Sequence, residues 1–260
     1  MDLELKGKTA IVTGGSQGIG KAIALELAQE GVDLVICSRR QEILDEAANE
    51  IASKTGRKVI ACAADMTRDE DVERLIGTAA ENLGGIQILI NNAALPGGLV
   101  TGPLSEANVD DLMLDINTKV LGYLRCAKAV APHMEKDNWG RIVNIGGLAS
   151  RNGGTISGLR NLSLVHLTKT LSGQLGSSGI TVNVIHPGLT RTEFTVDQAK
   201  AQGLSVQEYE KQAGKNITIG RLVDASEIAY LAAFICSPKS EAITGESIAA
   251  GGGLGEAVYP

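Results

Sequence analysis

The chain has 260 residues, of which 43% are hydrophobic and only 3% aromatic, and its formal net charge is −6. A core of Ala, Val, Ile and Leu is typical of a parallel sheet covered by helices on both faces, and one domain over residues 1–260 is expected. The acidic balance and the lack of a basic cluster argue against nucleic acid as a partner.

The four cysteines stand apart from one another, with no spacing typical of a metal site. We therefore expect no bound metal, and thiols buried in a reducing compartment. The first residues carry no basic segment followed by an apolar stretch, and no apolar window approaches about 18 residues. The expectation is a soluble, cytoplasmic protein without a membrane partner.

Short apolar runs alternate with segments of helical spacing. In chain order the pattern predicts a strand at 9–15, a helix at Ile19–Gln29, strands at 33–39 and 58–65, a helix at 69–84, a strand at 86–94, a helix at Val109–Glu135, a strand at 140–147, a helix at Ser157–Leu175, a strand at 179–188, a helix at 225–237 and a strand at 243–250. This alternation indicates right-handed crossovers and an α/β fold, a doubly wound parallel sheet of six or seven strands with helices on both faces.

The segment Thr190–Gly220 interrupts the alternation, because it is polar and rich in Lys, Glu and Gln. It follows the carboxyl end of a strand, where α/β folds bind ligands, so a substrate lid at about 190–220 is predicted. A peripheral helical excursion is the alternative.

The sequence TGGSQGIG places Gly14, Gly18 and Gly20 between the first strand and the first helix. Glycine permits a tight turn and close backbone approach, and the helix N-terminus offers free N–H groups to a pyrophosphate. In a β-α-β unit this spacing predicts a dinucleotide site; a glycine turn without a ligand is the alternative.

Ser38, Arg39 and Arg40 end the second strand, where an acidic residue would hold the adenosine ribose. A hydroxyl and a guanidinium can instead bind a 2′-phosphate, which favours NADP(H) over NAD(H). Ordinary surface arginines are the alternative.

Further blocks accompany the glycine turn: NNAA at 91–94, DINTKVLGYL around Asn117, GRIVNIGG, GITVNVIHPGLTRT and ITGES. Over essentially the whole chain they resemble the short-chain dehydrogenase/reductases. The family's T-G-x-x-x-G-x-G is met in full, while its N-N-A-G reads N-N-A-A here. The resemblance implies a Rossmann-type fold, a nicotinamide cofactor, a small-molecule substrate, and a homotetramer or homodimer built on the Asn117 and Ser157 helices.

The resemblance also implies an adenine pocket at Asp65–Met66, a nicotinamide clamp at Pro187–Leu189 and a diphosphate contact at Thr192. The full set of expected cofactor-binding residues is Gly14, Ser16, Gln17, Gly18, Ile19, Gly20, Ser38, Arg39, Arg40, Asp65, Met66, Asn92, Ala93, Asn161, Pro187, Gly188, Leu189 and Thr192.

Members of this family transfer a hydride with an Asn, Ser, Tyr and Lys set, in which the tyrosine protonates the carbonyl oxygen and the lysine lowers its pKa. Asn117 matches the asparagine. Counting back from GITVNVIHPG puts the lysine at Asn161 and the tyrosine at Ser157, and counting forward from GRIVNI puts the serine at Gly147. The chain is therefore predicted to be a divergent member lacking three of the four residues.

Ser157, Arg160 and Asn161 share one helix face. A serine hydroxyl is a poor proton donor, Asn161 can still bind the nicotinamide ribose, and Arg160 can orient a substrate carboxylate or polarise a water. The alternatives are a helix N-cap for Ser157 and a subunit salt bridge for Arg160. His186 is a further candidate on the substrate side, with a position-holding role as its alternative.

Three functions remain open: an atypical NADP(H)-dependent oxidoreductase, an inactive dinucleotide-binding member, and non-redox chemistry on the same scaffold. Tyr209 or Tyr259 could replace the missing acid in the first.

Overall fold

The computed structural model describes residues 1–151 and 153–255 and contains a sheet of seven parallel strands. Their order across the sheet is β3-β2-β1-β4-β5-β6-β9, which confirms the predicted doubly wound architecture. The strands are β1 (Thr9–Thr13), β2 (Asp33–Ser38), β3 (Val59–Ala63), β4 (Ile88–Asn91), β5 (Gly140–Ile145), β6 (Ile180–Pro187) and β9 (Ser247–Ala250). Strand order reverses at β1, so the crevice for a ligand lies at the carboxyl ends of β1 and β4.

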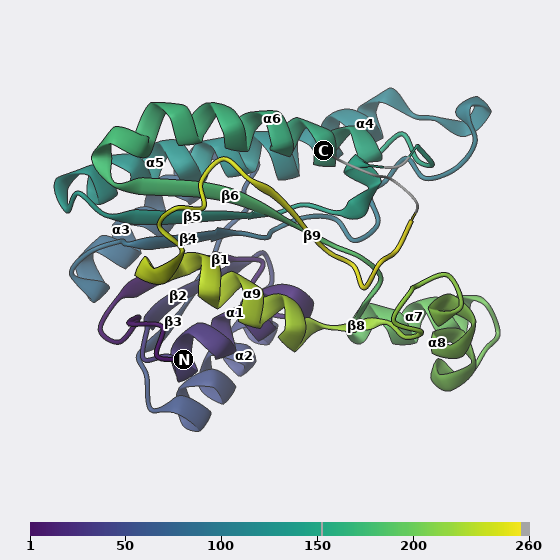
Figure 1. Cartoon of the computed structure of the whole chain (residues 1–260), viewed down its shortest axis with the longest axis horizontal. Helices are drawn as coiled ribbons and strands as arrows, with labels where there is room; N and C mark the ends of the chain where they lie inside the picture. The colour runs from purple at the N-terminus through teal and green to yellow at the C-terminus, as the bar shows by residue number, and fades with distance from the viewer. Residues whose placement is uncertain (152, 256–260) are drawn as a thin grey trace.

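Helices cover both faces of the sheet (Figure 1). One face carries α1 (Gly18–Gln29), α2 (Gln41–Thr55) and α9 (Ala225–Cys236); the other carries α3 (Asp69–Leu83), α4 (Val109–Ile116), α5 (Gly122–Lys136) and α6 (Gly158–Leu175). Short 3-10 turns lie at Leu104–Glu106, Leu148–Ser150, Gly176–Ser178 and Pro238–Ser240. Helix α2 was not among the predicted elements.

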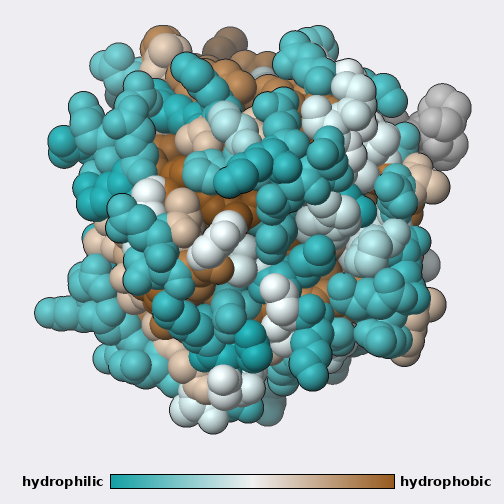
Figure 2. Space-filling model, turned by 90° about the vertical axis from the view of Figure 1, so that its left-hand side faces the viewer, coloured by the Kyte–Doolittle hydropathy of each residue, from teal (hydrophilic) through white to brown (hydrophobic). Residues whose placement is uncertain are grey.

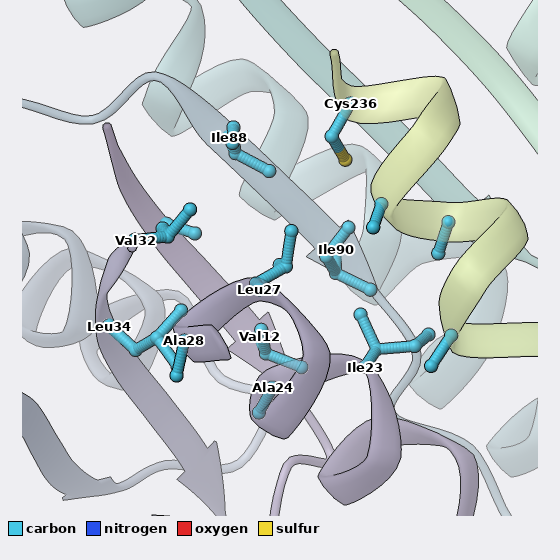
Figure 3. Close-up of a cluster of buried hydrophobic side chains, with 14 of the residues drawn as sticks. Val12, Ile23, Ala24, Leu27, Ala28, Val32, Leu34, Ile88, Ile90 and Cys236 are labelled. Carbon is cyan, nitrogen blue, oxygen red and sulfur yellow. The ribbon is translucent and has the colours of Figure 1, made fainter. Parts of the chain in front are cut away.

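Each face of the sheet has its own aliphatic core, because successive side chains of a strand point to opposite faces. In β1, Val12 joins the α1 and α9 side, whereas Ile11 joins the α3 and α5 side. Figure 3 shows Val12 and Ile90 of the sheet facing Ile23 and Leu27 of α1. All four cysteines are free and buried, as expected for thiols in apolar segments.

The predicted continuous helix over Val109–Glu135 is interrupted. Helix α4 begins after Asn108, whose side-chain oxygen accepts the N–H groups of Asp110 and Asp111. A π-helical turn over Asn117–Leu121 then separates α4 from α5. Such turns are rare and frequently lie at functional sites, so this one directs attention to the side chains it carries.

The insert after β6 forms a small unit beyond the carboxyl end of that strand, on the right in Figure 1. Strands β7 (Thr190–Arg191) and β8 (Val223–Asp224) pair in parallel and enclose α7 (Glu193–Ala201) and α8 (Val206–Gly214). Arg191 of β7 holds this unit together by ion pairs with Glu210 of α8 and Asp224 of β8. Within residues 1–151 and 153–255, no helix combines the length and apolarity that crossing a membrane requires.

Candidate cofactor and catalytic site

The turn between β1 and α1 admits only glycine at two positions. A Cβ at Gly20 would lie 2.2 Å from the Gly14 carbonyl oxygen, and one at Gly14 would lie 2.8 Å from Asn92 Nδ2. Asn92 Nδ2 donates to the carbonyls of Thr13 and Gly14 at 3.1 Å, and the Ala93 N–H donates to Thr13 Oγ1. The loop after β4 therefore holds the turn in shape.

The N-terminus of α1 already attracts a negative charge. Its N-cap, Gln17, makes no side-chain capping bond, and the first N–H groups of a helix have no partner within it. The Gly18 N–H donates instead to Glu193 Oε2 at 2.9 Å. Thr192 lies beside the same glycine, 3.4 Å from where a Cβ would stand. A carboxylate is therefore accepted at this helix end, as the free N–H groups and the helix dipole lead one to expect.

Two exposed arginines follow β2 at the position predicted for a 2′-phosphate. Arg40 Nη2 donates to Gln17 Oε1 at 3.1 Å, which connects this segment to the glycine turn. The Ser38 hydroxyl donates to the Arg40 carbonyl. In the part of the chain that the structure describes, neither Arg39 nor Arg40 forms an ion pair, so both guanidinium charges are available to a ligand.

Asp65 and Met66, the residues predicted for an adenine pocket, lie two and three residues after the end of β3 at Ala63. Asp65 Oδ1 accepts the N–H and the hydroxyl of Thr67 at 2.9 and 2.8 Å, which fixes the carboxylate at the carboxyl edge of the sheet. The Met66 side chain is buried in the core beneath it.

The predicted nicotinamide clamp ends β6. A Cβ at Gly188 would lie 2.7 Å from Gly251 Cα, so the two backbones pack directly against each other. The Leu189 carbonyl accepts the Val223 N–H and joins the clamp to the insert. Beside Gly251 lies a cavity of about 260 Å³, lined by Leu148, Arg151 and residues 249–255.

Asn117, the predicted catalytic asparagine, is the first residue of the π-helical turn. Its Oδ1 is buried and has no hydrogen-bond partner in the described part of the chain. An unpaired buried acceptor costs about 1–3 kcal/mol. This oxygen is therefore available to a bound group.

Ser157 stands at the N-cap position of α6 but does not cap the helix. Its hydroxyl accepts the Val100 N–H at 2.9 Å, and its side chain is 1% exposed. A Cβ at Gly98 would lie 2.5 Å from Ser157 Oγ, so the loop after β4 lies against the serine. The hydroxyl is enclosed by this loop.

Arg160 is also buried and engaged. Its guanidinium forms an ion pair with Asp115, which is fully buried, and its Nη2 donates to the Leu95 carbonyl at 3.0 Å. Arg160 does form a salt bridge, as one alternative predicted, but its partner Asp115 belongs to the same chain and not to another subunit. Arg160 and Ser157 share one helix face, as predicted, and together they hold the 95–100 loop.

Lys119 was not among the predicted site residues; it lies in the π-helical turn, two residues after Asn117. Its Nζ donates to Asn161 Oδ1 and to the Gly146 carbonyl, both at 2.9 Å. Burial, and secondly the charge of Arg160, lower the pKa of Lys119 to about 7, against the opposing effect of Asp115. The only signal in the sequence is a lysine within an otherwise largely apolar stretch of helix.

Gly147 and His186 border the same cluster. The Gly147 N–H donates to His186 Nδ1 at 3.0 Å, and a Cβ at Gly147 would lie 3.0 Å from Asn161 Nδ2. Burial lowers the pKa of His186 to about 4, which leaves the ring neutral near pH 7. These contacts favour the position-holding role for His186. Tyr209 lies half-buried on α8, and Tyr259 is outside the described residues.

Residues 14–255 match the family model described as enoyl-(acyl carrier protein) reductase. The chain is 37% identical to dehydrogenase/reductase SDR family member 4 of Oryctolagus cuniculus, over 96% of this chain and 94% of that protein. It is 34% identical to the NADPH-dependent reductase BacG of Bacillus subtilis, over 95% of this chain and 97% of that one.

Among solved structures, L-sorbose reductase from Gluconobacter frateurii, in complex with NADPH and L-sorbose, superposes with a TM-score of 0.92 at 27% identity. The match covers 98% of both chains. The family model and these full-length relatives agree with the seven-stranded sheet and the glycine turn, and the chain belongs to the short-chain dehydrogenase/reductase family.

Proposed function

We propose that this protein is an NADP(H)-dependent oxidoreductase that interconverts a carbonyl and an alcohol on a small molecule. The observation that carries the proposal is the glycine turn with two exposed arginines beside it, Arg39 and Arg40, which form no ion pair in the described part of the chain. A relative named as an NADPH-dependent reductase and a structural neighbour solved with NADPH support the same cofactor. The buried free thiols support a cytoplasmic location.

When bound, the cofactor supplies a hydride to the carbonyl carbon, and one proton must reach the carbonyl oxygen to give the alcohol and NADP⁺. The chain's own residues bind and orient: the first turn of α1 holds the pyrophosphate, and Asp65 lines the adenine pocket beside Met66, whose side chain packs in the core. Asn161 donates toward the nicotinamide ribose. Catalytic roles for Ser157 and Arg160 stay predictions, since both already bind the 95–100 loop.

The first test is a fluorescence titration with NADPH and NADH, followed by NADPH consumption across a broad panel of aldehydes and ketones. We expect NADPH to bind more tightly than NADH and at least one carbonyl to be turned over slowly. NADH preference would contradict the cofactor assignment.

Replacing Arg39 and Arg40 together with alanine is expected to weaken NADPH binding by about 10- to 100-fold, because a hydrogen bond to a charged group contributes about 1.5–3 kcal/mol. NADH lacks the 2′-phosphate, so its affinity is expected to stay unchanged. Lys136→Ala serves as a control, since this exposed lysine ends α5 at the opposite edge of the sheet. Equal losses for both cofactors would count against a 2′-phosphate site.

An inactive dinucleotide-binding protein is the second candidate, and the enclosed Ser157 hydroxyl favours it. It predicts the same NADPH preference without consumption of NADPH on any carbonyl in the panel. The titration and the turnover assay therefore separate the two.

The insert at about 190–220 is proposed to act as a lid over the substrate and cofactor site. The Glu193 carboxylate of this insert accepts a hydrogen bond from the Gly18 N–H. The carboxylate must therefore move away before a pyrophosphate can bind to that N–H. Cofactor binding is thereby coupled to the position of α7.

A homotetramer or homodimer is proposed to form on the α4, α5 and α6 side. Large exposed hydrophobic side chains gather on these helices, among them Val109, Met113, Leu124, Leu159 and Leu162. Figure 2, seen from the end opposite α7 and α8, shows hydrophobic side chains along its upper edge, the side of α5 and α6. Light scattering is expected to give a molar mass two or four times the 27.0 kDa of one chain. Leu162→Asp is expected to lower this molar mass, whereas Val206→Asp on α8 is expected to leave it unchanged.

A further inference from the structure

Lys119 is the one buried lysine in the described part of the chain, with a side chain 4% exposed. It forms no ion pair there; its two partners are the neutral Gly146 carbonyl and the Asn161 amide. Burying an ammonium without a carboxylate partner opposes folding. A fold retains such a group at a site where its charge is used, so Lys119 needs a functional explanation.

The contact with Lys119 fixes the orientation of the Asn161 side chain. Because an ammonium only donates, it must face Oδ1, and the Nδ2 group must point the other way. Nδ2 lies toward Gly147 and has no hydrogen-bond partner in residues 1–151 and 153–255. Nδ2 also keeps some accessible surface, so a ligand can reach it. Asn161 therefore presents two N–H donors to a ligand oxygen.

The groups that face Lys119 come from three elements. Asp115 of α4 and Arg160 of α6 form their own ion pair, so their charges largely offset each other. His186 of β6 lies near enough for its pKa to respond to Lys119, and it is neutral near pH 7. Arg151 adds a second positive charge near His186, since it too lowers the pKa of that ring. Among the groups that act on the pKa of Lys119, Asp115 and Arg160 offset each other, so the net charge beside the Asn161 amide comes from Lys119 itself.

We propose that Lys119 is a positioning residue of the cofactor site: it holds the Asn161 amide in one orientation and places a positive charge behind it. The ligand groups that this arrangement recognises are the hydroxyl oxygens of the nicotinamide-side ribose. A lysine from the π-helical turn thus supplies the charge that a lysine at position 161 would supply. This inference rests on the proposed NADP(H) binding.

The test compares NADPH affinity in wild type, Lys119→Met and Lys119→Gln by fluorescence titration between pH 6 and 9. Both variants are expected to bind NADPH about 10-fold more weakly at pH 6, because the Asn161 amide loses its fixed orientation toward the ribose and the positive charge behind it. The loss is expected to shrink as pH rises above about 7, because the wild-type amine then loses its proton. At each pH the affinity of the variant is divided by that of wild type, which cancels the effect of protonation of NADPH itself.

A second readout needs no cofactor. The lowered pKa means that the unfolded chain binds more protons than the folded one between about pH 7 and the normal lysine range. Wild-type stability relative to Lys119→Met is therefore expected to rise with pH over that interval, measured as the difference in Tm. Lys136→Met, at an exposed position, is the matched control and is expected to show no such trend.

Rescue separates positioning from packing. Adding Asn161→Lys to Lys119→Met returns one ammonium to the cluster and is expected to restore NADPH affinity. If wild type binds NADPH and both Lys119→Met and Lys119→Gln bind it equally tightly, the positioning role of Lys119 is overturned while the proposed function stands. Absence of NADPH binding in wild type overturns the proposed function and this inference with it. Weaker binding that is independent of pH and not rescued also overturns the positioning role.

Discussion

Replacing Gly20 with alanine is expected to weaken NADPH binding by at least about 100-fold, the effect of losing two hydrogen bonds to a charged phosphate. The added Cβ would lie 2.2 Å from the Gly14 carbonyl oxygen and 2.4 Å from Asn92 Nδ2. Backbone on one side and a doubly hydrogen-bonded amide on the other cannot both move away. The turn must then open, and its N–H groups lose their alignment. Fluorescence titration measures the loss.

Gly77→Ala is the matched control for this variant. Gly77 lies inside α3, and apart from its chain neighbours and the backbone of its own helix no atom lies within 4 Å of its ideal Cβ position. Alanine in a helix interior is more stable than glycine by about 0.5–1 kcal/mol. Gly77→Ala is therefore expected to raise Tm slightly and leave NADPH affinity unchanged. Normal NADPH binding by Gly20→Ala would show that the turn does not hold the pyrophosphate.

The glycine turn could be predicted from the sequence because its requirement is local: a left-handed φ at Gly14 and Gly18, next to a strand and a helix. The doubly wound parallel architecture follows from similar local alternation and the handedness of crossovers, whereas the order of the strands depends on contacts between distant segments. Helix α2 was not predicted, although its buried residues Leu44, Ala47, Ala48 and Ile51 follow helical spacing.

The catalytic side depended on contacts between distant segments. Lys119 and Asn161 are 42 residues apart in the chain, and a search for a lysine four residues after a tyrosine cannot find such a pair. The π-helical turn that carries Lys119 has no recognised sequence signal, so a continuous helix was predicted instead. Helical spacing predicts that Ser157 and Arg160 lie on one face of the helix. It does not predict that both contact the 95–100 loop.

Arg160→Met is expected to reduce the free energy of unfolding by about 3–5 kcal/mol, because it leaves Asp115 buried and charged without its partner. Asp115 is fully buried and Arg160 is 4% exposed, so water cannot replace the lost contact. The Leu95 carbonyl loses a donor as well. Urea unfolding monitored by circular dichroism measures the change.

The double variant Asp115→Leu/Arg160→Met tests whether the pair acts structurally. Replacing both members of a buried ion pair by apolar residues of similar size is often neutral or stabilising, so most of the lost stability is expected to return. If Arg160 only holds the 95–100 loop, NADPH affinity and carbonyl turnover return with the stability. If Arg160 instead orients a substrate carboxylate, stability returns while KM for that substrate stays raised. The second outcome would move Arg160 from the scaffold of the site to its substrate-binding surface, and would make an acidic carbonyl compound the substrate class.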